Sequence, residues 1–485
     1  MITLLRGGWL AAWQDSRHQI VERGEVVFQD GVILYAGPHF DGPADIVVDR
    51  PDWFICPGFI NLHGHVGVDP FAPLVDVPRS GQFSPGPDFV QQAPLQMWPT
   101  LTPEEQRLSG EFCLVQMLRT GTTTVVDAHG YGAIWWLGNP PTDEAALAET
   151  VGRLGCRAYL ALGYRSARSY KDRNGVARQH WDEEMGLAGL QEGLRFALEY
   201  RGAHDGRVQT LLTPHAVEKC TPELLAATLT EARAADLPVQ VHTSQSVHEV
   251  ELVRQRHGDT PVGFLHSLGF LGPDIILGHC VFVDDHPAVG GTSDRDLRLI
   301  SAAGSSVAHA PLAFARRDAE ALHTLPRYLD YGINVGLGCD IWPADIISEM
   351  RLAWLMGKHA NGTVDRPTCL EVFTAATSGS ADALRRDDLG RLAPGARADV
   401  VCVDLSRYHF GPVLDPVRAL VSFGTGQDVD RIYVDGQMIV DGGNVLNADE
   451  EELRIAAPQI MSKLHAAATE RDPAGRTPSS ILGQV

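Results

Sequence analysis

Two histidines separated by one residue, His63 and His65, end an apolar run near the start of the chain. In a β-strand, residues i and i+2 point the same way, so both imidazoles can face one site. His242 and Asp340 end two later apolar runs. Three neutral imidazoles and a carboxylate can hold a divalent cation and leave a position for water, which is the open coordination of a catalytic centre.

A cation held by these four side chains would lower the pKa of a water molecule to about 7 and supply hydroxide at neutral pH. Zinc is the expected ion, and Fe²⁺ is the alternative because imidazole and carboxylate ligands suit both. Any one of the histidines could instead be a hydrogen-bonded core residue. The set as a whole, and no single member, therefore predicts a metal site.

Eight apolar, β-branched runs alternate with helical patterns through the middle of the chain and would position these ligands. The runs cover 57–65, 122–130, 157–166, 207–216, 238–246, 274–283, 305–313 and 334–343. Amphipathic patterns follow most of them, such as Pro222–Ala235 and Glu349–His359. Eight consecutive βα units predict an α/β fold with a closed (β/α)8 TIM barrel over 57–387, whose active site lies at the carboxyl ends of the strands.

An open doubly wound sheet is the competing fold. It would need a glycine-rich phosphate loop after the first strand, and the segment from Gly58 to Gly67 contains no G-x-G-x-x-G. This absence favours the barrel.

Both ends of the chain show short β-type runs separated by turn residues. The runs are Glu25–Phe28, Gly31–Ala36, Ile46–Val48, Asp399–Asp404, Ala419–Ser422 and Arg431–Val434, and Asp435-Gly436 is a hairpin signal. We expect 1–56 and 388–448 to form one small β-sandwich domain. Residues 449–485 should form a C-terminal helix over Asp449–Glu470 and then a mobile tail.

Composition limits the possible partners. With 40 Lys and Arg against 61 Asp and Glu, the net charge is −21, which disfavours binding to nucleic acid or to a membrane surface. The eight cysteines include no C-x-x-C pair and fit a reducing compartment better than a disulfide framework. The N-terminus is interpreted as a strand and not as a signal peptide. We expect a cytoplasmic homodimer or higher homo-oligomer whose partner is a small-molecule substrate.

A set of motifs spread over nearly the whole chain resembles the amidohydrolase superfamily, in the branch of cytosine and guanine deaminases and s-triazine hydrolases. The motifs are Pro57-Gly58-Phe59-Ile60-Asn61-Leu62-His63-Gly64-His65, Gly121-Thr122-Thr123-Thr124-Val125-Val126-Asp127, Thr213-Pro214-His215, His242, Gly278-His279-Cys280, Gly338-Cys339-Asp340, and Leu389-Gly390-Arg391-Leu392 with Ala398-Asp399-Val400. The resemblance implies that His279 is catalytic and that His215 binds substrate. No lysine lies in the fourth strand where dinuclear relatives carry a carbamylated bridge, which implies one metal ion per chain.

Three departures from the family pattern concern the pocket. Gln245 stands where family deaminases place a glutamate, and an amide cannot shuttle protons. Pro311-Leu312-Ala313-Phe314 replaces the usual Pro-x-Ser-Asn, and Ile341-Trp342-Pro343 replaces small residues after Asp340. We therefore expect a remodelled, more apolar pocket in which nucleobase deamination is disfavoured.

Aromatic side chains follow several predicted strand ends and suit flat apolar ligands. They are Trp135, Trp136, Tyr164, Phe314 and Trp342. The long loop over 66–102 carries further aromatics, including Trp98, and is expected to act as a lid. Packing between barrel and lid is the alternative for the aromatics at the strand ends, and a passive insertion is the alternative for the loop. The predicted substrate contacts are His215, Gln245, Trp98, Trp342 and His309.

These features predict a mononuclear metal-dependent hydrolase of a C–N bond in an amide, urea, carbamate or substituted N-heterocycle that is largely apolar or aromatic. His279 would deprotonate or orient the water, Asp340 would be a second proton acceptor, and Gln245 would bind a carbonyl or ring heteroatom with His215. One alternative is a deaminase or dechlorinase of a pyrimidine, purine or s-triazine that uses another acid, for which Glu249 is a candidate. Another is a non-catalytic barrel that only binds metal or ligand.

Overall fold

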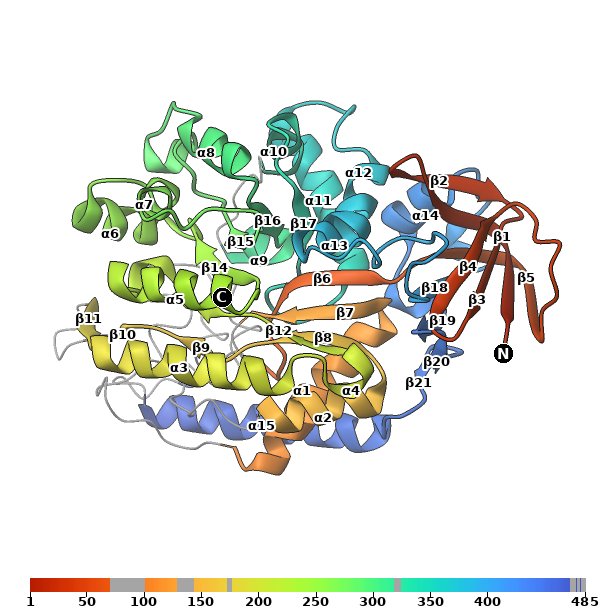
Figure 1. The fold of residues 1–485 in the computed structure, drawn as a ribbon, viewed down its shortest axis with the longest axis horizontal. Helices are drawn as coiled ribbons and strands as arrows, with labels where there is room; N and C mark the ends of the chain where they lie inside the picture. The colour runs from red at the N-terminus through yellow and green to blue at the C-terminus, as the bar shows by residue number, and fades with distance from the viewer. Residues whose placement is uncertain are drawn as a thin grey trace.

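The computed structural model describes residues 1–69, 101–128, 144–171, 177–317 and 324–471, together with 477 and 480. Parallel strands form the centre of the molecule (Figure 1). They are β6 Phe59–Gly64, β7 Thr122–Asp127, β8 Arg157–Leu160 continued by β9 Gly163–Tyr164, β12 Val208–Thr210 continued by β13 Thr213–Pro214, β14 Val239–Thr243, β15 Ile275–His279, β16 Ser306–His309 and β17 Val335–Leu337. Each of the eight predicted runs contains an observed strand, and the predicted barrel is confirmed.

The strands follow one another around the barrel in chain order. Four of them pair as β6-β7-β8-β12 and four as β14-β15-β16-β17. A parallel bridge between Leu212 and Val239 joins the two groups. The last strand returns to the first where the Asp340 N–H donates to the His63 carbonyl at 2.9 Å. Closure therefore occurs at two of the predicted metal ligands.

Helices cover the outside of the barrel (Figure 1). They are α1 Pro103–Arg119, α2 Glu144–Leu154, α3 Glu183–Tyr200, α4 Ala203–Gly206, α5 Pro222–Ala234, α6 Val247–His257, α7 Pro261–Ser267, α8 Arg295–Ala303, α9 Pro311–Arg317, α10 Thr324–Asp330, α11 Ile346–Asn361, α12 Cys369–Thr374, a π-helical turn at Ala375–Gly379 and α13 Ser380–Ala383. Many begin at a capping residue, as α5 does, where the Thr221 hydroxyl accepts from the Leu224 N–H and Pro222 takes the first helical position.

The two ends of the chain meet in a nine-stranded sheet beside the barrel (Figure 1). Its strands are β1 Thr3–Gln14, β2 Arg17–Glu22, β3 Glu25–Gln29, β4 Val32–Gly37, β5 Ile46–Pro57, β18 Val400–Asp404, β19 Val429–Val434, β20 Gln437–Asp441 and β21 Asn444–Val445. β5 from the N-terminal part pairs antiparallel with β18 from the C-terminal part, so the sheet is built from both ends as expected. The Asp435-Gly436 pair forms the predicted hairpin turn, with φ of +47° and +71°.

One predicted strand is wrong. Ala419–Ser422 lies within helix α14, Pro416–Phe423. The Asp415 side chain accepts from the Arg418 N–H, and Pro416 occupies the first turn. This Asp-Pro start is a helix signal, and it outweighs the apolar composition that suggested a strand.

The barrel and the sheet are joined by buried charges. Arg157 of β8 is fully buried, and its guanidinium lies 3.2 Å from Asp399 and 2.9 Å from Asp435.

The last helix, α15 Glu450–Arg471, packs along α1 and agrees with the predicted helix over Asp449–Glu470 (Figure 1). Most of the tail beyond it lies outside the described residues. No helix in the described part of the chain is long and apolar enough to span a membrane.

Candidate metal centre

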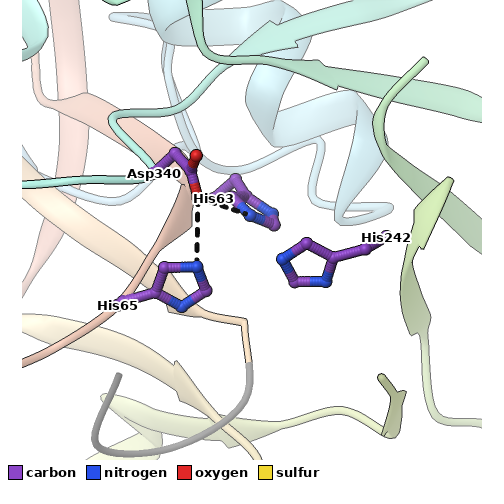
Figure 2. A group of neighbouring side chains, drawn as sticks. All are labelled: His63, His65, His242 and Asp340. Atoms are coloured by element: carbon purple, nitrogen blue, oxygen red, sulfur yellow. Dashed lines mark hydrogen bonds and ion pairs between the residues drawn. The ribbon is translucent and has the colours of Figure 1, made fainter. Parts of the chain in front are cut away.

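Four side chains converge at the carboxyl ends of β6, β14 and β17. Figure 2 shows His63, His65, His242 and Asp340 turned toward a common space. One potential ligand atom from each lies within 4.8 Å of the others. Asp340 Oδ1 is 3.4 Å from His63 Nε2 and 3.0 Å from His65 Nε2. The structure thus brings together all four residues predicted to bind metal.

The backbone around Asp340 is fixed against β6. The Asn61 side-chain oxygen accepts from the N–H of His63 at 3.3 Å and from that of Cys339 at 3.0 Å. A Cβ at Gly338 would lie 2.6 Å from the His63 Cβ, so only glycine permits this approach of the two strands. Asp340 itself has a φ of +56°. These contacts carry the carboxylate to the side of the barrel where the histidines lie.

Gln240 determines which nitrogen of His63 faces the cluster. Its Nε2 donates to the Leu62 carbonyl at 2.8 Å, which leaves its Oε1 as an acceptor 2.9 Å from His63 Nδ1. Nδ1 must therefore carry the proton, and Nε2 presents a lone pair. His63 Nε2 is shielded from solvent and has no hydrogen-bond partner among the described residues. Histidines that bind metal ions are commonly oriented by a hydrogen bond from the ring nitrogen that does not face the metal, as Gln240 orients His63. The four side chains therefore fit a divalent cation.

Electrostatics agree with that donor set. Burial raises the pKa of the Asp340 carboxyl, but the charge of His279 and the close approach of His63 and His65 together hold that pKa well below its usual value. Burial lowers the pKa of His63, and the interaction with Asp340 only partly offsets it. An ionised carboxylate and a neutral imidazole are the forms that bind metal ions.

Two more predicted residues complete a cluster of imidazoles. The His279 ring lies 4.5 Å from that of His63 and 5.1 Å from that of His242, centroid to centroid. The His215 ring lies 4.4 Å from that of His242. His279 and His215 are 1% and 3% exposed. The structure therefore places the predicted catalytic and substrate-binding histidines against the ligand set.

Gln245 lies two residues beyond β14 and is half-buried. Its backbone N–H donates to a carboxylate oxygen of Glu249 at 2.7 Å, and the Ser244 N–H donates to the other oxygen at 2.6 Å. Glu249 thus folds back from α6 toward the strand end. Burial, followed by the charge of Glu218, raises its pKa well above the usual value.

Of the remaining predicted substrate contacts, the structure describes His309 and Trp342 but not Trp98. His309 ends β16 and is 1% exposed; burial lowers its pKa to about 3, and its carbonyl accepts from the Gly338 N–H at 2.9 Å. Trp342, two residues after Asp340, is half-buried, and its indole Nε1 has no hydrogen-bond partner among the described residues. Trp98 and most of the predicted lid over 66–102 lie outside the described residues, as do Trp135 and Trp136.

Phe314 and Tyr164, both predicted to line the substrate site, lie in different surroundings. The Phe314 ring meets the His279 ring edge-on at 4.9 Å and belongs to an apolar cluster with Phe282 and Ala313. The Tyr164 hydroxyl instead lies 3.0 Å from Thr228 of α5, so this side chain packs between barrel and helix. Of these two, Phe314 adjoins the imidazole cluster.

The sequence interpretation did not identify Gln240 and Asn61. Gln240 lies two residues before His242 on the same strand, so the period of two that relates His63 to His65 could have identified it. Asn61 stands in the same relation to His63. Gln240 and Asn61 were missed because an uncharged amide side chain does not by itself indicate a metal-binding or catalytic role.

Comparison with known proteins identifies similar chains along almost the whole length. The sequence model of the family described as "Amidohydrolase family" matches residues 54–439. The 5'-deoxyadenosine deaminase of Methanosarcina barkeri is 29% identical, over 92% of this chain and 95% of that protein. An adenosine deaminase of Xanthomonas campestris with bound zinc has a TM-score of 0.76 at 21% identity, over 96% of this chain and 98% of its own. The atrazine chlorohydrolase of Arthrobacter aurescens TC1, complexed with zinc, has a TM-score of 0.73 at 22% identity, over 95% and 100%.

Proposed function

The chain belongs to the amidohydrolase family, and from that premise we propose that it hydrolyses the bond between a small nitrogen heterocycle and an exocyclic nitrogen substituent. We further propose that one zinc ion per chain, held by His63, His65, His242 and Asp340, serves the reaction. The observation that carries the proposal is the approach of these four ligand atoms to within 4.8 Å, with His279 and His215 packed against them.

A divalent ion held by these four residues would lower the pKa of a water molecule to about 7 and would supply hydroxide at neutral pH. His279 orients the attacking water and accepts its proton in this proposal, because its ring lies 4.5 Å from that of His63 and 5.1 Å from that of His242. Asp340 is the second acceptor. Its low pKa keeps it ionised, and its Oδ1 lies at hydrogen-bond distance from His65.

Gln245 and His215 bind the substrate in this proposal. The Gln245 amide can donate to or accept from a ring nitrogen or carbonyl oxygen, but it cannot transfer a proton. Proton transfer to the leaving nitrogen therefore falls to His279 and Asp340. In this proposal Glu249, the alternative acid, holds backbone N–H groups with both oxygens and does not serve as the proton donor.

The substrate class is inferred from the side chains that surround the imidazole cluster and from the relatives. Phe314 packs edge-on against His279 within an apolar cluster, which suits a planar ligand with few polar groups. The relatives named above act on a deoxyadenosine, on adenosine and on atrazine, all of which contain flat nitrogen heterocycles. We propose a substituted pyrimidine, purine or s-triazine as substrate, so the deaminase relatives outweigh the expectation from Gln245 that nucleobase deamination is disfavoured.

A substrate panel tests the proposal. Metal-loaded enzyme is incubated with amino- and alkylamino-heterocycles, chloro-heterocycles, and acyclic amides, ureas and carbamates, and products are followed by mass spectrometry and ammonia release. The proposal expects turnover of aminoheterocycles that is lost in Asp340→Ala and kept in His359→Gln, an exposed histidine on α11. Turnover confined to acyclic compounds would contradict the proposed substrate class, and no turnover of any compound by metal-loaded enzyme would support a binding-only barrel.

We also propose that 1–56 and 388–448 form one small domain beside the barrel over 57–387, and that the protein is a cytoplasmic homodimer or larger homo-oligomer. Analytical ultracentrifugation tests the assembly, and a monomer at micromolar concentration would contradict it.

A further inference from the structure

We propose that Glu249 is a positioning residue whose buried carboxylate fixes the turn that carries Gln245 and, through this turn, the loop that follows His279. The inference rests on the proposed function, because Gln245 and His279 are the groups that Glu249 would hold in place. It concerns the turn that carries Gln245, an amide at the position where the deaminases that this sequence resembles place a glutamate.

Both carboxyl oxygens of Glu249 accept hydrogen bonds from the main chain. Its oxygens accept from the Ser244 N–H at 2.6 Å and from the Gln245 N–H at 2.7 Å. Glu249 is 1% exposed and Ser244 is fully buried. Hydrogen bonds from N–H groups to a carboxylate are short and strong, and here water cannot compete for them. The Ser246 hydroxyl accepts from the Glu249 N–H at 3.1 Å, which fixes the start of α6 and the origin of the side chain.

The turn held in this way has an unusual backbone. Ser244 has a φ of +52°, in the left-handed region that non-glycine residues seldom adopt. Such a conformation persists only where its surroundings determine it. The two N–H groups that donate to Glu249 belong to the peptide units on either side of the Ser244 Cα, so the hydrogen bonds fix the orientation of both peptides and the direction in which Gln245 leaves the strand.

The same turn fixes the neighbouring strand end. The Ser244 carbonyl accepts from the N–H groups of Val281 and Phe282, at 3.1 and 2.9 Å. The Thr243 carbonyl accepts from the Cys280 N–H at 2.9 Å. His279, directly before this segment, has a φ of +78°. Displacement of Ser244 would therefore displace the backbone that follows His279.

The substitution Glu249→Gln tests this role with little change of shape. One acceptor oxygen becomes an NH2 group, which faces a backbone N–H and cannot bond to it. We expect kcat to fall by about tenfold to a hundredfold, as small misplacements of catalytic groups do. Both limbs of the pH profile of kcat should remain and the metal content should be unchanged. Glu251→Gln, an exposed glutamate on the same helix, is the matched control and should match the parent.

Amide hydrogen exchange provides a readout that needs no substrate. Peptides covering 243–249 and 278–283 should exchange faster in Glu249→Gln than in the parent, and Glu251→Gln should leave both unchanged. Unchanged exchange, a kcat within twofold of the parent, or loss of one limb of the pH profile would each overturn the inference, the last because it would make Glu249 a proton carrier. If the parent turns over no compound, the proposed function fails, and the exchange rates alone decide whether Glu249 holds the turn.

Discussion

The side-chain oxygen of Gln240 lies 2.9 Å from Nδ1 of His63, while the amide nitrogen of Gln240 donates to the Leu62 carbonyl. The second contact fixes the orientation of the amide, and the first therefore fixes the tautomer of the imidazole. His63 Nε2 consequently presents its lone pair to His65, His242 and Asp340. An uncharged residue that binds no metal itself thus prepares one of the ligands.

The substitution Gln240→Leu should weaken metal binding by about tenfold to a hundredfold, the usual cost of losing an outer partner of a ligand histidine. Competition with a chromogenic chelator measures this affinity. Gln209→Leu is the control, since Gln209 also lies in a barrel strand but its amide donates to the Gly206 carbonyl. Equal metal affinities in parent and Gln240→Leu would show that the tautomer of His63 does not depend on Gln240.

Restoring the family carboxylate by Gln245→Glu should lower activity on the native substrate at least about tenfold, which corresponds to roughly 1.4 kcal/mol on the barrier. A carboxylate three residues beyond His242 would add a negative charge close to the proposed ligand set, which would raise the pKa of the new carboxyl and disturb proton transfer. Metal content should stay at the parent level, because Gln245 is not a proposed ligand. Steady-state kinetics decide, and a variant as fast as the parent would contradict the proposed role of the amide.

Trp342 provides a test of the proposed pocket wall. Its indole N–H is shielded from solvent without a partner among the described residues, so Trp342→Phe removes a donor while keeping apolar area. We expect Trp342→Phe to raise KM and Trp342→Ala to raise it further, with little change in kcat, if the side chain binds ground and transition states alike. A KM equal to that of the parent in both variants would exclude contact between Trp342 and substrate.

Stability should decrease with acid partly because of His18. This side chain is buried, Nε2 lies 2.9 Å from the Thr377 hydroxyl, and burial followed by the charge of Arg391 lowers its pKa from 6.5 to about 3. Below pH 6.5 the unfolded chain binds a proton that the folded chain excludes, so stability falls as the pH decreases from 6.5 toward 3. The slope for one such group reaches at most about 1.4 kcal/mol per pH unit.

The substitution His18→Gln should therefore make the decrease of Tm between pH 7 and pH 5 shallower, even if Tm at pH 7 is lower. Thermal unfolding followed by circular dichroism measures the slope. His359→Gln, an exposed histidine, should keep the slope of the parent. An unchanged slope in His18→Gln would show that His18 does not titrate as proposed.

The barrel could be predicted because each strand is an apolar run that ends in turn residues, and the eight runs recur in order. His63, His65, His242 and Asp340 were identifiable because period and position place them at strand ends. Ala419–Ser422 was misassigned because composition outweighed the Asp415-Pro416 helix start. The contacts of Glu249 depend on the left-handed turn at Ser244, whose carbonyl accepts from Val281 and Phe282 of the neighbouring strand end, and these partners are distant in the sequence.

Metal content per chain tests the central claim most directly. The parent, purified without chelators, should contain one zinc or iron ion per chain by elemental analysis. His63→Ala and Asp340→Ala should lose the ion and the activity together, while His359→Gln should retain both. Two ions per chain, none after gentle purification, or an undiminished ion in His63→Ala would contradict a single metal centre formed by His63, His65, His242 and Asp340.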